Sequence, residues 1–272
     1  MSIVSAFARR YPSTARYLGS WLARLSDVCD GVYTVILSEF IADGSRSPLR
    51  LLEREVTLAV QYCPNFAALV AEKDPLPTDC DQANRSVLDK LAEVHAIVGL
   101  HRLGFGDIVF SGRPDFTASK DGNEYGIEVK RLGPSTGIRS DLYDERGGSV
   151  ETGLFIGKAS SNGKLPKALS HGLKGAIAEK ALQLSKSRPQ GNGIIWISLG
   201  RDYIPASKYE TFGMPGYARG MRRTVEQSLN EAMATPLLRF DDREVDYRST
   251  AFVILSTGAD QDEKVGNWPQ LG

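Results

Sequence analysis

Residues 113–130, RPDFTASKDGNEYGIEVK, carry the strongest structural signal in this chain. Two strand-like segments flank a central Asp-Gly-Asn, and residues of these types accept the positive φ angles that a tight hairpin turn demands. Glu128 and Lys130 are two residues apart, so on a strand their side chains point to the same face. If the hairpin brings Asp115 alongside, two carboxylates and one ammonium converge. The stretch therefore predicts a β-hairpin that carries a charged site.

The residue types at this site suit metal-assisted hydrolysis of a phosphodiester. Carboxylate oxygens are the ligands that Mg²⁺ prefers, and a lysine beside a metal can bind phosphate or orient a water. Structural alternatives exist for each residue: Asp115 follows a proline, as turn residues often do, and Lys130 could be a plain ion-pair partner for a buried Glu128. The ion pair alone leaves Asp115 unexplained, which favours a functional site.

Pro114-Asp115 followed by Glu128-Val129-Lys130 resembles the signature of the PD-(D/E)xK nuclease superfamily, which has the restriction-endonuclease-like fold. The resemblance implies that Asp115, Glu128 and Lys130 are catalytic. It also implies that Asp115, Glu128 and the Val129 carbonyl hold Mg²⁺, with Mn²⁺ as a substitute. An acid on the preceding helix often completes the metal site in this family. Glu93 is our first candidate for that acid and Asp89 is its rival.

The elements around the hairpin also fit an α/β protein with an αβββαβ core and a mixed central sheet, as the resemblance implies. Apolar spacing and turn residues predict helices and strands in alternation after residue 84. In chain order we expect a helix at 84–103, strands at 107–110, 114–119 and 125–132, a helix at 165–187, a strand at 193–199, a helix at 218–234 and a strand at 250–255. A Gly- and Ser-rich segment at 133–162 is expected to be a functional loop.

The chain before this core reads as helical. Apolar residues recur at helical spacing from residue 13 to residue 73, and Pro48 opens one of the predicted helices. The arginine-rich start also resembles a transit peptide in composition, but its continuing apolar stripe favours a helix. Prolines at 75 and 77 stop the helical pattern. We therefore expect a helical N-terminal region at 1–78 and a nuclease-like domain at 79–272.

Composition sets limits on partners and location. The formal net charge is zero, and the content of 42% hydrophobic and 24% charged residues is ordinary for a soluble globular protein. No apolar run could span a bilayer, and no secretory signal is evident, so a cytoplasmic location is expected. Polar residues of the later helices are candidates for nucleic-acid binding, and two of them, Lys180 and Gln183, are also candidates to reach the active site. They are Lys164, Lys167, Lys174, Lys180, Gln183, Arg219, Arg222 and Arg223.

These observations predict a Mg²⁺-dependent nuclease, a hydrolase that acts on DNA in preference to RNA. An endonuclease of restriction, defence, recombination or repair is the leading interpretation. An RNA-cleaving toxin on the same fold is one alternative. A non-catalytic nucleic-acid-binding or assembly protein with a nuclease-like fold is the other. Cutting both strands with one site per chain favours a homodimer.

Overall fold

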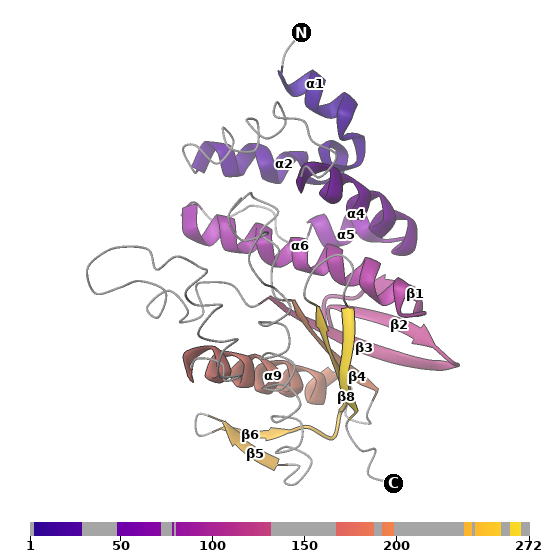
Figure 1. The fold of residues 1–272 in the computed structure, drawn as a ribbon, viewed down its shortest axis with the longest axis vertical. Coiled ribbons are helices and arrows are strands. Elements are labelled where there is room, and N and C mark those ends of the chain that lie inside the picture. Colours follow the sequence, from indigo (N-terminus) through magenta and orange to yellow (C-terminus); the bar gives the residue numbers. More distant parts are fainter. Residues whose placement is uncertain are drawn as a thin grey trace, which may run out of the picture. The chain divides into compact units, whose positions relative to one another are not determined.

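The computed structural model describes residues 3–28, 48–71, 78, 80–131, 167–187, 192–198, 237–240, 243–256 and 262–267. These residues form two compact units, one ending at Gly112 and one beginning at Arg113. The expected domain boundary at residue 78 stays a prediction. The helix that follows it belongs to the first unit. The protein is thus of the mixed α/β class, with helices and a mixed sheet (Figure 1).

The first unit consists mainly of helices. They are α1 (Ile3–Arg10), α2 (Pro12–Val28), α4 (Pro48–Tyr62), α5 (Phe66–Ala71) and α6 (Cys80–Arg102), and strand β1 (Gly106–Phe110) follows. Helices α2, α4 and α6 pack against one another. Trp21, Val56 and Ile97, one from each helix, are buried in this core. The helical character expected for residues 13–73 is confirmed where this segment is described, except in the turn at residues 63–65.

The apolar segment at 48–73 is not one continuous helix. Helix α4 ends at Tyr62, and α5 begins at Phe66 after a turn. Pro64 lies in that turn and has no backbone N–H to continue a helical ladder. The side chain of Asn65 hydrogen-bonds both the N–H and the C=O of Phe110, at 3.0 and 2.7 Å. The interruption therefore ties the helices to β1.

The second unit contains a five-stranded mixed sheet in the order β2-β3-β4-β7-β8. Its strands are β2 (Phe116–Lys120), β3 (Asn123–Arg131), β4 (Gly193–Ser198), β7 (Thr250–Ser256) and β8 (Asp262–Asn267). Strands β3, β4 and β7 are parallel, while β2 and β8 pair antiparallel at the two ends of this order. A separate antiparallel pair consists of β5 (Leu237–Phe240) and β6 (Arg243–Asp246). The expected mixed sheet is confirmed.

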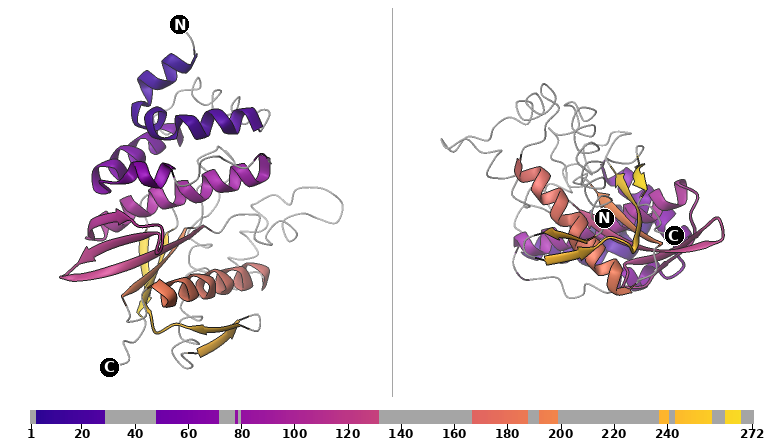
Figure 2. Two further views of the ribbon diagram at one scale, coloured as in Figure 1. Left: turned by 180° about the vertical axis from the view of Figure 1, so that it is seen from behind. Right: turned by 90° about the horizontal axis from the view of Figure 1, so that it is seen from below.

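The middle of this sheet is built from an apolar run. All six residues of β4 are buried, as expected for a parallel strand covered on both faces. Helix α9 (Lys167–Ser187) packs on β3, β4 and β7. The β2–β3 hairpin extends past the start of β4, because the β3–β4 pairing begins only at Gly126 (Figure 2). The sheet and α9 together place the charged residues of the site.

Most elements expected after residue 84 are present. Helices α6 and α9 and strands β1, β2, β3, β4 and β7 match predicted segments, with ends shifted by a few residues. The loop expected at 133–162 and the helix expected at 218–234 lie outside the described residues. Strands β5, β6 and β8 were not anticipated. None of the helices in the described part of the chain is long and apolar enough to cross a membrane.

Candidate functional site

The β2–β3 hairpin sets the positions of the two predicted carboxylates. Asp121 and Gly122 connect the strands with φ angles of 51° and 79°, and Lys120 faces Asn123 across the turn. Positive φ at both central residues matches the twist of paired strands, which explains the Asp-Gly sequence. Phe116 and Ile127 are the last pair of the β2–β3 ladder, so Asp115 and Glu128 follow this pair at the same end of the hairpin. The predicted hairpin is confirmed.

Asp115 is held by the backbone of β3. Its Oδ2 accepts a hydrogen bond of 2.7 Å from the N–H of Val129. On a strand, the N–H and C=O of one residue point to the same side, since antiparallel partners exchange both bonds. The Val129 carbonyl therefore lies on the same side of β3 as Asp115. The expected role of Asp115 and the Val129 carbonyl as ligands of one metal ion stays a prediction.

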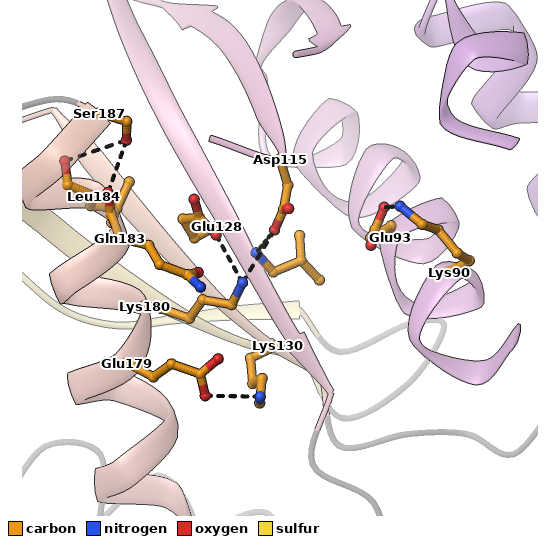
Figure 3. A network of polar contacts seen from close by, with 11 residues as sticks. Lys90, Glu93, Asp115, Glu128, Lys130, Glu179, Lys180, Gln183, Leu184 and Ser187 are labelled. Carbon is orange, nitrogen blue, oxygen red and sulfur yellow. Dashed lines mark hydrogen bonds and ion pairs between the residues drawn. The ribbon is translucent and has the colours of Figure 1, made fainter. Parts of the chain in front are cut away.

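Glu128 meets a lysine from α9. Lys180 Nζ lies 2.8 Å from Glu128 Oε2 and 3.6 Å from Asp115 Oδ2, and so forms ion pairs with both carboxylates (Figure 3). The side chains of Glu128 and Lys180 are only 6% and 10% exposed. A buried carboxylate or ammonium is costly without a partner, so each charge stabilises the other. Two acids and one lysine do converge, as the sequence predicts, but the lysine is Lys180.

The electrostatics of this cluster are dominated by burial. Burial raises the pKa of Glu128 to about 7 and Asp115 adds to the rise, while Lys180 opposes it. For Lys180, burial alone acts to lower the pKa of the ammonium. The charges of Asp115 and Glu128 outweigh that effect and raise its pKa above the ordinary value. Lys180 is therefore a stable cation at neutral pH, whereas Glu128 changes its charge near pH 7.

Lys130 does not contact the two carboxylates. Its Nζ lies 2.9 Å from Glu179 Oε2, so among the described residues Lys130 forms an ion pair with Glu179 (Figure 3). The expectation that the Lys130 ammonium joins Asp115 and Glu128 is wrong for the geometry seen. The physical reason is that α9 supplies two neighbouring charges. Lys180 forms an ion pair with the buried Glu128, and Glu179 forms a partly exposed ion pair with Lys130.

Glu93 lies on α6 in the first unit, where its side chain contacts a lysine of the same helix. Its Oε2 accepts a hydrogen bond of 2.7 Å from Lys90 Nζ, and Lys90 is buried. Lys90 also lies over the Phe110 ring, 5.3 Å from the ring centre. A carboxylate with a buried ammonium partner has a structural reason to be present. The metal-binding role of Glu93, and that of its rival Asp89, stay predictions.

The predicted nucleic-acid contacts are described only in part. Lys180 is buried in the charged cluster, and Gln183, one turn later on α9, is exposed. Lys167 and Lys174 lie on α9, but their side chains are outside the description. The other four predicted residues lie outside the described residues. They are Lys164, Arg219, Arg222 and Arg223.

The donor set can be tested against the ion that the sequence implies. Mg²⁺ is commonly bound through one or two carboxylates, with waters completing its shell. Asp115, Glu128 and the Val129 carbonyl supply oxygen ligands of this kind, so the residues fit. No cluster of three or more His, Cys, Asp or Glu side chains occurs among the described residues. A site at Asp115 and Glu128 would therefore rely on two carboxylates.

Sequence reasoning named Lys180, with Gln183, as a candidate to reach phosphate or the active site, but did not pair it with Glu128, although a local signal was present. Ile177, Ala181 and Leu184 form the buried stripe of α9, and Lys180 falls on the same stripe. A lysine at such a position must either leave the core or find buried acids. Its proximity to Glu128 depends on how α9 packs on β3, which no local pattern encodes.

Comparisons of this chain with models of known protein families, with curated proteins and with solved structures found no match.

Proposed function

We propose that this protein is a Mg²⁺-dependent nuclease, an endonuclease that hydrolyses phosphodiester bonds of DNA. One observation carries the proposal: Asp115, directly before β2, and Glu128, on the paired strand β3, both contact the Lys180 ammonium. Two carboxylates about one position are the arrangement that binds a divalent cation. The element order α6-β1-β2-β3-α9-β4 supports a restriction-endonuclease-like αβββαβ core.

The chain's own groups would divide the work as follows. Asp115, Glu128 and the Val129 carbonyl would hold Mg²⁺, or Mn²⁺ in its place, and Glu93 is the further candidate ligand. The bound ion would polarise the scissile phosphate and lower the pKa of a water. The Val129 N–H keeps Asp115 oriented before the ion arrives. Oxygen from the water would bond to phosphorus and the bond to the 3′ oxygen would break, leaving a 5′-phosphate and a 3′-hydroxyl.

Lysine at this site would stabilise charge that develops on the phosphate. Lys130 is the residue that the sequence resemblance assigns to this task. The exposed Gln183 and the remaining predicted cations would contact the sugar-phosphate backbone of DNA. These contacts would contribute affinity more than sequence specificity. Cleavage of both strands would call for a homodimer.

One observation favours a second candidate, a nucleic-acid-binding protein with an inactive nuclease-like site. Both carboxylates already have protein partners, since Lys180 pairs with each and Val129 donates to Asp115. A purely structural ion pair would have this form. Such a protein would bind nucleic acid without metal-dependent turnover, so a cleavage assay separates the two candidates.

The test is a cleavage assay on linear, circular and single-stranded DNA, with tRNA in parallel to detect an RNA-cleaving toxin. We expect DNA cleavage with Mg²⁺ or Mn²⁺ and none in EDTA. Glu128→Gln and Asp115→Asn should each lower the rate by about 100-fold or more, in line with losses of electrostatic stabilisation in active sites. Glu124→Gln, an exposed acid on β3, and Asp121→Asn in the turn are matched controls and should cleave normally.

Two results would reject the nuclease. The first is cleavage that survives both Glu128→Gln and EDTA, because the activity would then come from another site or a contaminant. The second is binding of DNA with no cleavage under any metal condition, which supports the non-catalytic candidate. Cleavage of tRNA but not of DNA would keep the chemistry and change the substrate.

A further inference from the structure

Lys180 and Lys130 make different contacts, and this difference carries an inference that rests on the proposed function. The Lys180 ammonium forms ion pairs with both Asp115 and Glu128, whereas Lys130 forms an ion pair with Glu179. We propose that Lys180, from helix α9, is the catalytic lysine that contacts the scissile phosphate. Lys130 is a positioning residue that holds α9 in register through Glu179.

Burial is the first argument. The Lys180 side chain is 10% exposed and that of Lys130 is 32% exposed, with Glu179 at 48%. An exposed ion pair contributes about 0–1 kcal/mol, while a buried ammonium is tolerated only with close partners. Burying the Lys180 ammonium therefore carries a desolvation cost, which its ion pairs with Asp115 and Glu128 must offset. A lysine that only joined helix to strand could do so at the surface, as Lys130 does.

Donor geometry is the second argument. An ammonium has three N–H donors, and the hydrogen bond to Glu128 uses one of them. The contact with Asp115, at 3.6 Å, is an ion pair beyond hydrogen-bond length. Among the described residues, Lys180 thus has donors not used in a hydrogen bond, which could meet an oxygen of a bound phosphate within the carboxylate cluster. Donating to that oxygen as negative charge grows would stabilise the transition state without transferring a proton.

Charge balance is the third argument. Asp115 and Glu128 bring two negative charges when ionised, and Lys180 brings one positive charge. A divalent cation in this cluster would make the total charge positive, which favours an anionic phosphate. Lys130 adds nothing to this balance, because Glu179 neutralises it.

The two lysines form crossed pairs between β3 and α9. Glu128 on β3 pairs with Lys180 on α9, and Lys130 on β3 pairs with Glu179 on α9 (Figure 3). Residues 179 and 180 are adjacent, so a shift of α9 along β3 would strain both pairs together. The Lys130–Glu179 pair thereby fixes where the Lys180 ammonium lies.

The experiment compares lysine variants of the full chain by single-turnover DNA cleavage and by direct titration with Mn²⁺. Lys180→Met keeps the apolar stem and removes the charge, and Lys180→Arg keeps the charge. Lys130→Met and Glu179→Gln break the outer pair. Lys186→Met, an exposed lysine in the last turn of α9, is the matched control.

We expect Lys180→Met to cleave about 100-fold more slowly while still binding Mn²⁺ as tightly as the wild type or more tightly. Tighter binding is the signature of removing an ammonium that competes for the same carboxylates. Lys180→Arg should recover part of the rate. Lys130→Met and Glu179→Gln should lose about 10-fold or less, and Lys186→Met should match the wild type.

The result that overturns the assignment is normal cleavage by Lys180→Met, or a loss in Lys130→Met as large as in Lys180→Met. If Lys180→Met does not fold, the assignment is supported when Lys130→Met loses about 10-fold or less and a folded Lys180→Arg loses more. It is overturned when Lys180→Arg keeps wild-type activity and Lys130→Met shows a large loss. Failure of the proposed function looks different, because the wild type itself then cleaves nothing and Lys180 has no catalytic role.

Discussion

Replacing Glu128 by glutamine should change how the stability of the protein depends on pH. Glu128 is buried, and its folded-state pKa of about 7 exceeds the ordinary value of 4.5. Between these values the unfolded chain ionises Glu128 while the folded protein keeps it protonated. Unfolding then releases a proton, so rising pH favours the unfolded state. Glutamine carries no such proton, so Glu128→Gln removes this contribution.

The size of the effect follows from the two pKa values. One pKa unit corresponds to about 1.36 kcal/mol. The interval between 4.5 and about 7 therefore corresponds to about 3 kcal/mol. This stability is fully present below pH 4.5 and is lost as pH rises through 7. Relative to Glu128→Gln, the wild type should lose about 3 kcal/mol of unfolding free energy between those limits.

The assay is urea denaturation of both proteins in EDTA, so that Glu128 has only protein partners. Unfolding free energies are measured at steps from pH 4.5 to pH 8, and the difference between the two proteins is plotted against pH. Other titrating groups are common to both proteins and largely cancel in the difference. Glu124→Gln serves as the control, because Glu124 is exposed on the same strand.

A difference that stays flat across this range would refute the burial argument. The opposite slope, in which the unfolding free energy of the wild type rises relative to that of Glu128→Gln as pH increases, would mean that attraction to Lys180 outweighs desolvation of Glu128. The site would then be a strong ion pair with an ionised Glu128 throughout, and the raised pKa would be wrong.

Two further predictions concern the scaffold. Gly193→Ala should destabilise the fold by about 3 kcal/mol in denaturant unfolding. A Cβ there would overlap the backbone oxygen of Ser249, to which Gly193 N–H donates. Glu53→Ala should cost about 1–2 kcal/mol by the same measurement, since its carboxylate accepts from the first-turn N–H groups of Ser13 and Thr14 at 2.9 and 2.7 Å. Glu53→Gln should recover part of that loss, and an unchanged Glu53→Ala would show that water replaces the carboxylate.

Much of the fold follows from local sequence. Asp121-Gly122 fixes the hairpin because few residue types accept positive φ at both turn positions. The run of apolar residues in β4 predicts a buried central strand, and Pro48 marks the start of α4. The same signals place Asp115 at the start of one hairpin strand and Glu128 on the other, and the structure has Asp115 directly before β2, so the two carboxylates of the candidate site are predictable.

Other features have weak local signals. Strands β5, β6 and β8 are short, and β8 (Asp262–Asn267) has the sequence DEKVGN, which lacks an apolar alternation. The break at Pro64 follows from proline chemistry, but the hydrogen bonds of Asn65 to Phe110 join residues 45 positions apart. Such pairings depend on tertiary packing and not on neighbouring residues.

The sequence by itself determined the hairpin and the two acids on it, because turn chemistry and strand periodicity act over a few residues. Only the tertiary structure decided which lysine meets those acids. Lys130 shares a strand with Glu128, yet Lys180 makes the contact from 52 residues away. The packing of α9 on β3 places Lys180 beside Glu128, a buried carboxylate that requires a cationic partner. Lys130 instead forms an ion pair with Glu179 of α9.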